Sequence, residues 1–184
     1  KTFVPGSCGR PVVHMEVKID SHDPENVPGE ILARGLNVML GYYKNEEATQ
    51  NTLDKEGWYH TGDLGTMDAE GNIFIKGRSK NMLLSSNGQN IYPEEVEDQL
   101  NSLPMVMESV VVQRGDKLAA LVHPDFEEAK TMGLSTDDLQ KLMEENRTTI
   151  NAELPAYSKI TEIELHEDEF EKTPKKSIKR YLYK

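Results

Sequence analysis

The pattern of apolar residues changes near residue 78, and this change constrains the fold more than any other feature. Before it, apolar and polar residues alternate in short runs bounded by glycine, such as "GEILAR" from Gly29 and "GNIFIKG" from Gly71. Alternation of this kind is typical of half-buried strands. After it, helical spacing appears between strand-like runs. The sequence therefore predicts two domains, residues 1–79 and 80–184, with a bend in "GRSKN".

The first domain should be a small antiparallel β subdomain. "VVHMEVKI" alternates Val13, Met15, Val17 and Ile19 against more polar neighbours, which indicates a strand. "MDAEGN" has the Asp and Gly content of a hairpin turn before "GNIFIKG".

The second domain should be an α+β unit. "YPEEVEDQL" begins with proline and acids, which suit a helix N-terminus, and "RGD" separates two apolar strands. "DFEEAKTMG" predicts a short helix that ends at Gly133, and Ser135 can cap a longer one. A last strand is expected at residues 161–165. We expect roughly three strands in one sheet with three helices.

Composition indicates a globular chain. It has 184 residues, of which 36% are hydrophobic, and no apolar run approaches the length of a membrane span. "KTFVPGSCGRP" lacks the features of a secretion signal and is expected to be a cut edge. The single cysteine, Cys8, cannot form an internal disulfide, which favours a reduced, cytoplasmic location.

The charge distribution is uneven. The formal net charge is -11, yet "KTPKKSIKRYLYK" from Lys172 onward holds six of the 21 Lys and Arg residues and none of the 32 acids. The acidic body should repel nucleic acid and anionic lipid. A basic tail on such a body requires an explanation.

"GWYHTGDLG", residues 57–65, presents the first candidate site residue. Asp63 is expected in a turn before a strand, where an ionised carboxylate can accept hydrogen bonds from two sugar hydroxyls. The alternative is that Asp63 only caps the turn. His60 is expected to be structural, because no two histidines have metal-ligand spacing and no cysteine pair exists, which argues against zinc.

"SSNGQNIYP", residues 85–93, is a polar loop around Gly88 that can bring backbone groups close to a ligand. Most such loops only turn the chain. The sequence contains no GxxxxGK[ST], GxGxxG or GxSxG, so it offers no phosphate-cradling loop of its own.

Four segments occur together in a characteristic order: "GEILARGLNVMLGYYKNEEAT", "GWYHTGDLG", "GNIFIKGRSKNMLLSSNGQNIYPEEVE" and "FEKTPKKSIKR". In order and spacing they resemble the adenylate-forming acyl-CoA synthetase family. The closing "TP…IKR", with "NIYPEEVE", is most similar to the long-chain fatty acid CoA ligase branch.

The resemblance implies a two-step enzyme. ATP and a carboxylate give an acyl-adenylate and pyrophosphate with Mg2+; coenzyme A then forms the thioester and AMP leaves. Residues 1–79 would be the last subdomain of a large N-terminal AMP-binding domain, and residues 80–184 its mobile C-terminal lid. Fatty acid, ATP and CoA would be the substrates, with no cofactor held tightly by this fragment. Without the N-terminal part the chain should be inactive; the whole enzyme could lie peripherally at a membrane.

The resemblance also implies roles for individual residues. Asp63 matches the aspartate that holds the ribose hydroxyls, and Arg78 matches an arginine that contacts the nucleotide. Lys80 falls on the hinge about which the lid rotates. Gly88 falls in the loop that lines the pantetheine tunnel, where a side chain would obstruct the passage.

The tail departs from the family pattern. A family lysine stabilises charge as pyrophosphate leaves, and aligning "TPKKSIKR" by its ends puts Ser177 at that position. A serine cannot supply the charge, but the adjacent Lys176 could, with Lys175 one residue further. We expect Lys176 to be the catalytic candidate; a solvated tail is the alternative.

Two other functions remain open. One is an acyl-AMP ligase that hands its acyl group to the phosphopantetheine of a carrier protein. The other is an acidic interaction module whose basic tail docks on nucleic acid or a membrane, which predicts binding that weakens steeply with salt.

Overall fold

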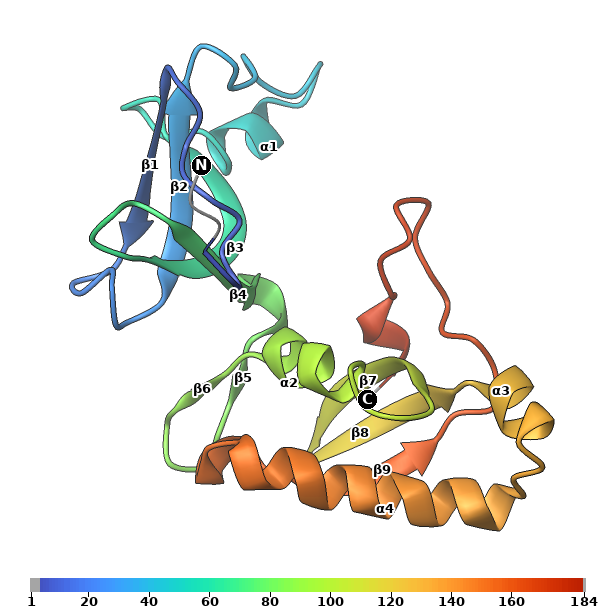
Figure 1. Cartoon of the computed structure of the whole chain (residues 1–184). Helices are drawn as coiled ribbons and strands as arrows, with labels where there is room; N and C mark the ends of the chain where they lie inside the picture. The colour runs from blue at the N-terminus through green and yellow to red at the C-terminus, as the bar shows by residue number, and fades with distance from the viewer. Residues whose placement is uncertain (1–3, 184) are drawn as a thin grey trace. The chain divides into compact units, whose positions relative to one another are not determined.

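The computed structural model describes residues 4–183. The chain divides into two compact units between Asn81 and Met82, each built on its own sheet (Figure 1). This confirms the predicted mixed α+β class. Residues 1–3, where "KTFVPGSCGRP" begins, and Lys184, the last cation of the tail, lie outside the described residues.

The first unit is a four-stranded antiparallel sheet in the order β1-β2-β3-β4 (Figure 1). The register is interrupted in the β2–β3 and β3–β4 pairs, which marks local bulges. The elements are β1 (Met15–Asp20), β2 (Gly29–Gly35), α1 (Glu46–Gln50), β3 (Tyr59–Met67), β4 (Ile73–Arg78) and the 3-10 helix η1 (Ser79–Asn81).

The core of this sheet is small and made of isoleucines. Ile19, Ile31 and Ile73 are buried together. The predicted first strand begins later than expected, because Met15 N donates to Val12 O at 3.0 Å and forms a turn. Val13, which the alternation placed inward, is 82% exposed.

The hairpin predicted at "MDAEGN" is present between β3 and β4. Asp68 N donates to Asn72 O at 3.0 Å, and the Asp68 carboxylate accepts from Asn72 N at 2.7 Å. Gly71 has φ +83°, a conformation that glycine adopts without strain. These contacts fix the register of β4 and so the position of Arg78 at its end.

The second unit contains a three-stranded sheet in the order β7-β8-β9. β7 and β8 are antiparallel, whereas β8 and β9 are parallel, which requires a long crossover. Two helices supply it (Figure 1). The elements are β5 (Leu83–Leu84), β6 (Asn90–Ile91), α2 (Pro93–Leu100), β7 (Val106–Arg114), β8 (Lys117–Pro124), α3 (Phe126–Thr131), α4 (Thr136–Glu153), η2 (Ala156–Ser158), β9 (Ile160–Leu165) and η3 (Arg180–Leu182).

Both predicted helix starts of the crossover carry caps. Ser135 forms a capping box with Asp138 at the start of α4, and Asp125 accepts from Glu128 N at the start of α3. Gly133 follows α3 with φ +71°. The caps satisfy backbone N–H groups that the helices leave unpaired.

The two faces of this sheet are covered differently. One face packs against α2 and α4, where Leu100 and Met143 are fully buried. The other face packs against the C-terminal tail through Phe170, with Ile178 and Tyr183 beside it. The tail is therefore part of the folded unit. Among the described residues no helix is both long and apolar enough to cross a membrane.

Candidate functional site

Asp63 lies within β3, opposite Arg78 of β4. The sequence placed it in a turn before a strand, which is wrong. Gly62, at φ +72°, and the register shift after Leu64 interrupt the alternation that would have indicated the strand. The carboxylate is thus carried by an irregular strand rather than by a loop.

Asp63 and Arg78 form an ion pair across the two strands. Asp63 Oδ1 lies 2.9 Å from Arg78 Nε, and Arg78 Nη1 donates to Thr61 O at 2.8 Å. The side chains are 33% and 50% exposed, so both face solvent while their orientation is fixed. A Cβ at Gly62 would make an ordinary contact, 3.4 Å from Arg78 Nη1, so the positive φ of +72° rather than crowding favours glycine here.

A second set of contacts holds the backbone of this strand. Thr61 Oγ1 accepts from Asp63 N at 3.0 Å and donates to Ile31 O at 2.7 Å. Glu30 Oε1 accepts from Gly62 N at 2.9 Å. Neither Thr61 nor Glu30 was predicted, because the contacts join strands some thirty residues apart in the sequence.

His60 belongs to this supporting set. Its Nδ1 lies 2.8 Å from Glu30 Oε2, and its Nε2 lies 3.9 Å from Asp54 Oδ2. The pKa of the Asp54 carboxyl is lowered, mainly because it accepts a hydrogen bond from Trp58 N–H. Within residues 4–183 no three His, Cys, Asp or Glu side chains gather to hold a metal ion.

The Asp63–Arg78 pair places a hydrogen-bond acceptor, the Asp63 carboxylate, beside a cation, the Arg78 guanidinium. Of the two Asp63 oxygens, Oδ1 contacts Arg78, while Oδ2 has no hydrogen bond among the described residues. An ionised carboxylate on a side chain that is one-third exposed can accept hydrogen bonds from hydroxyl groups.

The predicted hinge and tunnel residues are both exposed. Lys80 lies in η1, at the division between the units. Gly88 lies in the turn between β5 and β6 at φ +79°, where its N–H donates to Ser85 O at 2.9 Å. A Cβ there would meet nothing within 4 Å, so backbone conformation rather than crowding favours glycine in this unit.

The tail forms a narrow loop around Lys175 and Lys176. Lys172 and Ile178 pair as an antiparallel bridge, and Thr173 N donates to Ser177 O at 2.8 Å. Lys176 adopts φ +63°, which tightens the turn. Lys175, Lys176 and Ser177 are exposed, and within the described chain neither lysine forms an ion pair.

The other described tail cations are paired within the second unit. Lys172 Nζ lies 2.7 Å from Glu108 Oε1, and Lys179 Nζ lies 3.0 Å from Glu171 Oε2. Hydrogen bonds to these carboxylates raise the pKa of both lysines. The tail is therefore not a free basic arm, and among its described residues the unpaired cations are Lys175 and Lys176 at the tip.

Arg180 makes the most buried ion pair of the tail. It contacts the Glu97 carboxylate of α2, whose side chain is 8% exposed and also accepts from Val111 N at 2.5 Å. Burial raises the pKa of Glu97 to about 7, although the Arg180 charge offsets part of this effect. The basic motif at the chain's end thus has a structural role that the sequence did not indicate.

The AMP-binding enzyme C-terminal domain family matches residues 80–183. The 2-succinylbenzoate–CoA ligase of Bacillus cytotoxicus is 42% identical over 61% of this chain and 24% of its own length. The 4-coumarate–CoA ligase 1 of Oryza sativa subsp. japonica is 36% identical over 95% of this chain and 31% of its own length.

A solved structure is similar over nearly the whole chain. O-succinylbenzoate coenzyme A synthetase from Bacillus subtilis, in complex with AMP, has a TM-score of 0.76 and 28% identity over 97% of this chain and 35% of the other. The same synthetase in complex with ATP and magnesium ion has a TM-score of 0.75 over 96% of this chain and 35% of the other. The chain thus spans only about a quarter to a third of the proteins that it resembles.

Proposed function

This chain belongs to the AMP-binding enzyme family, whose C-terminal domain it contains, and from that premise we propose that it is the C-terminal part of an ATP-dependent acyl-CoA ligase. Residues 1–79 would complete the large AMP-binding domain, and residues 80–184 would be the mobile lid. The relatives named above as CoA ligases support this reaction class. The chain alone would not turn over, because it is a minor part of such enzymes.

The Asp63–Arg78 pair is the observation that carries the proposal. Asp63 would accept hydrogen bonds from the ribose hydroxyls, and Arg78 would hold the carboxylate in place and contact the nucleotide. The geometry supports this role because Arg78 engages Asp63 Oδ1, while the Asp63 side chain as a whole remains one-third exposed. The contacts from Thr61 and Glu30 fix the strand before any ligand arrives.

The tail loop would supply positive charge to the adenylation step. Lys176 is adjacent to Ser177, the residue that aligns with the family's lysine. The Lys176 side chain is exposed at the tip of the tail loop. A fixed cation stabilises negative charge that develops as pyrophosphate leaves. The bridge between Lys172 and Ile178 holds the base of the loop and so limits where the tip can reach.

Lys80 and Gly88 would serve the second step. Lys80, in the short η1 helix, would be the hinge about which the lid rotates. Gly88, at the exposed tip of the β5–β6 turn, would line the path of the pantetheine arm of CoA.

ATP, Mg2+ and CoA would be bound by the whole enzyme. The similar synthetase was solved with ATP and magnesium ion, which supports the first two. Mg2+ would arrive with the ATP phosphates, whose charge it neutralises. For the acyl substrate we propose a long-chain fatty acid, on the strength of the "TP…IKR" and "NIYPEEVE" motifs.

The test is product analysis with the whole enzyme. Incubation with ATP, Mg2+, CoA and palmitate should give palmitoyl-CoA and AMP in equal amounts, and omission of CoA should still allow pyrophosphate release. Coumarate and succinylbenzoate serve as competing acids: a preference for either would refute the fatty acid assignment while retaining the ligase. ADP as the product would refute the reaction class.

A further inference from the structure

The first unit exposes large apolar side chains on the segment that joins β2 to α1. Leu36, Leu40 and Tyr43 are 98%, 102% and 88% exposed, so almost nothing in the described chain covers them. Tyr42 beside them is also exposed. We call these four residues the β2–α1 surface. In Figure 1 the segment runs out beyond the end of β2 before it returns to α1.

Hydrogen bonds anchor this segment at both ends. Val38 N donates to Gly35 O at 3.1 Å where the segment leaves β2, and Tyr42 N donates to Thr49 Oγ1 of α1 at 2.9 Å. Gly41 approaches α1 so closely that a Cβ would lie 2.8 Å from Thr49 Cγ2. The apolar side chains are thus displayed on a held backbone, which lowers the ordering cost of a contact.

A cavity of about 460 Å³ lies between the segment and α1. Leu40 and Tyr42 line it together with Thr49 of α1. Its charged lining residues are Lys44 and Glu46, one of each sign, so the cavity selects no partner by net charge. Tyrosine is enriched at the buried centre of protein interfaces. The cavity therefore suits an apolar side chain of a protein partner.

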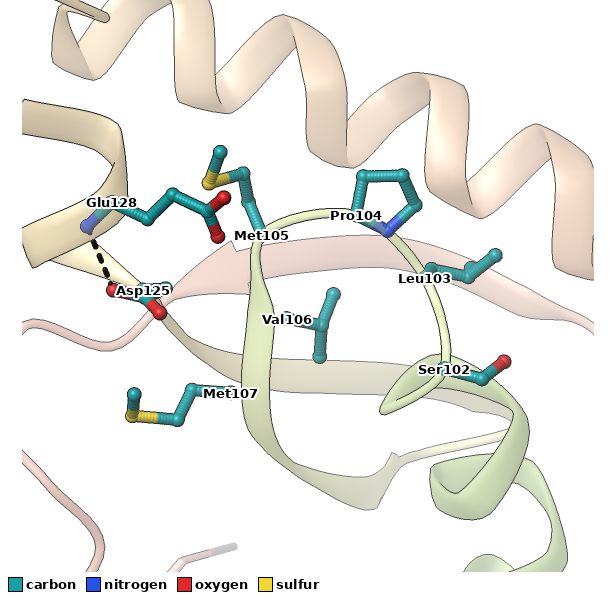
Figure 2. A pocket seen from close by; sticks show the side chains of 8 residues that line it. All are labelled: Ser102, Leu103, Pro104, Met105, Val106, Met107, Asp125 and Glu128. Atoms are coloured by element: carbon teal, nitrogen blue, oxygen red, sulfur yellow. Dashed lines mark hydrogen bonds between the residues drawn. The ribbon is translucent and has the colours of Figure 1, made fainter. Parts of the chain in front are cut away.

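The cavity of the second unit, about 370 Å³, differs from this one (Figure 2). Leu103 and Met105 line it, but both pack on the core of that unit. Asp125, also in the lining, caps α3. Little apolar surface is left there for a partner, in contrast to the β2–α1 surface.

The first unit buries little apolar surface of its own. Its core cluster consists of Ile19, Ile31 and Ile73, whereas the second unit has a much larger cluster. Among the described residues, the four most exposed large apolar side chains all belong to the first unit. A small domain with so little burial is marginally stable by itself. Further apolar surface should therefore pack on it.

The remainder of the enzyme is the partner that these observations favour. The chain covers only 35% of the similar synthetase from Bacillus subtilis. If residues 1–79 complete the large AMP-binding domain, the rest of that domain is covalently tethered to the first unit. A tethered partner is present at a high effective concentration, which favours it over a separate protein.

We propose that the β2–α1 surface packs against the N-terminal part of the same enzyme. Apolar side chains of that part cover Leu36, Leu40 and Tyr43, and one of them fills the cavity beside α1. The inference rests on the proposed function only in taking this chain as the C-terminal part of a longer enzyme.

The experiment is hydroxyl-radical footprinting, which labels side chains that water reaches, on the isolated chain and on the whole enzyme. Tyr43 should be labelled about tenfold more slowly in the whole enzyme, because its exposed fraction would fall from 88% towards the 7% of the buried Trp58. Leu36 and Leu40 should lose labelling with it. Trp58 is the control and should be labelled slowly in both proteins.

A matched pair of substitutions gives a second measurement. Leu40→Lys should lower the thermal midpoint of the whole enzyme by several degrees and leave that of the isolated chain unchanged, because the charge is buried only when the N-terminal part is present. Met132→Lys makes the same change on an exposed side chain of the second unit and should lower neither midpoint. A whole enzyme that fails to fold with Leu40→Lys, while the isolated chain folds, supports the proposal equally.

Equal labelling of the β2–α1 surface in the two proteins would overturn the proposal. Slow labelling already in the isolated chain would also overturn it, because the surface would then be covered without the N-terminal part. The same follows if Leu40→Lys destabilises the isolated chain as much as the whole enzyme. Protection in a whole enzyme that shows no acid-dependent pyrophosphate release would support the surface and refute the ligase.

Discussion

At the residue scale, Asp63 depends on contacts from another strand. Within its own strand, Thr61 Oγ1 accepts a hydrogen bond from Asp63 N. From β2, the Glu30 carboxylate accepts from Gly62 N and contacts the His60 ring. The carboxylate is therefore oriented before a ligand binds, which reduces the ordering cost of binding. The same contacts explain why His60 and Asp54, although polar and close, are supports for the strand.

Replacing Asp63 should impair nucleotide binding in the whole enzyme. A charge-assisted hydrogen bond is worth about 1.5–3 kcal/mol, so Asp63→Ala should weaken ATP binding by roughly 10–100-fold. The sharper measurement compares ATP with 2′-deoxy-ATP. The wild type should discriminate between them, and Asp63→Ala should not.

Asp20→Ala is the matched control, since this aspartate is exposed at the end of β1 in the same unit. It should leave ATP binding and the discrimination unchanged. If Asp63→Ala still discriminates as the wild type does, the ribose assignment is wrong.

The sequence predicted residues whose role is local and missed those whose role is tertiary. Ser135 and Gly71 were predicted because a helix cap and a hairpin turn are set within a few residues. Asp63 was placed in a turn but lies in strand β3, because Gly62 and Gly65 interrupt the alternation that would have indicated the strand. Glu30 gave no signal, because its partners lie on a neighbouring strand.

At the element scale, the tail closes the sheet of the second unit. Phe170 is buried against the sheet, and Tyr183 Oη accepts from Glu171 N at 2.7 Å. The paired cations anchor both sides of the loop that carries Lys176. This arrangement accounts for three of the six cations at the chain's end, Lys172, Lys179 and Arg180, which from sequence could equally indicate a docking arm.

Removing Arg180 should loosen the tail. Arg180→Ala leaves the buried Glu97 without its cation, which for an ionised carboxylate typically costs about 3–5 kcal/mol; the loss should be largest above pH 7, because a protonated Glu97 needs no cation. Lys179→Ala breaks a more exposed pair, which solvent screens, and should destabilise the unit much less. Amide hydrogen exchange of β7 and β8 measures the destabilisation caused by each variant. Equal losses of protection in Arg180→Ala and Lys179→Ala would show that the Arg180 pair is no more important than the Lys179 pair.

Glu97 should make the stability of the second unit depend on pH. Its folded pKa of about 7 lies above the ordinary value of 4.5, so the folded state holds the proton more tightly. The extra stability is complete below pH 4.5 and is lost as pH rises to about 7, on the order of 3 kcal/mol in all. Glu97→Gln should lack this loss.

The measurement is the unfolding free energy of wild type and Glu97→Gln between pH 4.5 and 8. The difference between the two curves isolates Glu97 from the many exposed acids. Parallel curves would show that the Glu97 carboxyl titrates normally.

The elements of the second unit were predictable from sequence, but the way they pack together was predictable only in part. The helices and strands of the second unit follow from caps and apolar spacing, so its α+β class was readable. The parallel pairing of β9 with β8 was not, because pairing direction depends on the crossover. The docking of Phe170 was missed for a similar reason: one buried aromatic in a charged tail leaves no periodic signal.

At the scale of the whole molecule, the two units divide the proposed chemistry. The first carries the Asp63–Arg78 pair, and the second carries the tail loop and the Gly88 turn. Lys80, at the division, is the proposed hinge. Separate sheets with separate cores suit parts that move as rigid bodies during a two-step reaction.

Pyrophosphate release by the whole enzyme tests the central claim most directly. With ATP, Mg2+ and palmitate but no CoA, the wild type should release pyrophosphate only when the acid is present. Lys176→Ala should reduce the rate by roughly a hundredfold, about 2.7 kcal/mol of transition-state stabilisation, and Lys159→Ala should leave it unchanged. An unchanged rate in Lys176→Ala would remove this lysine from the mechanism. Absence of acid-dependent release in the wild type would contradict the assignment as an adenylate-forming ligase.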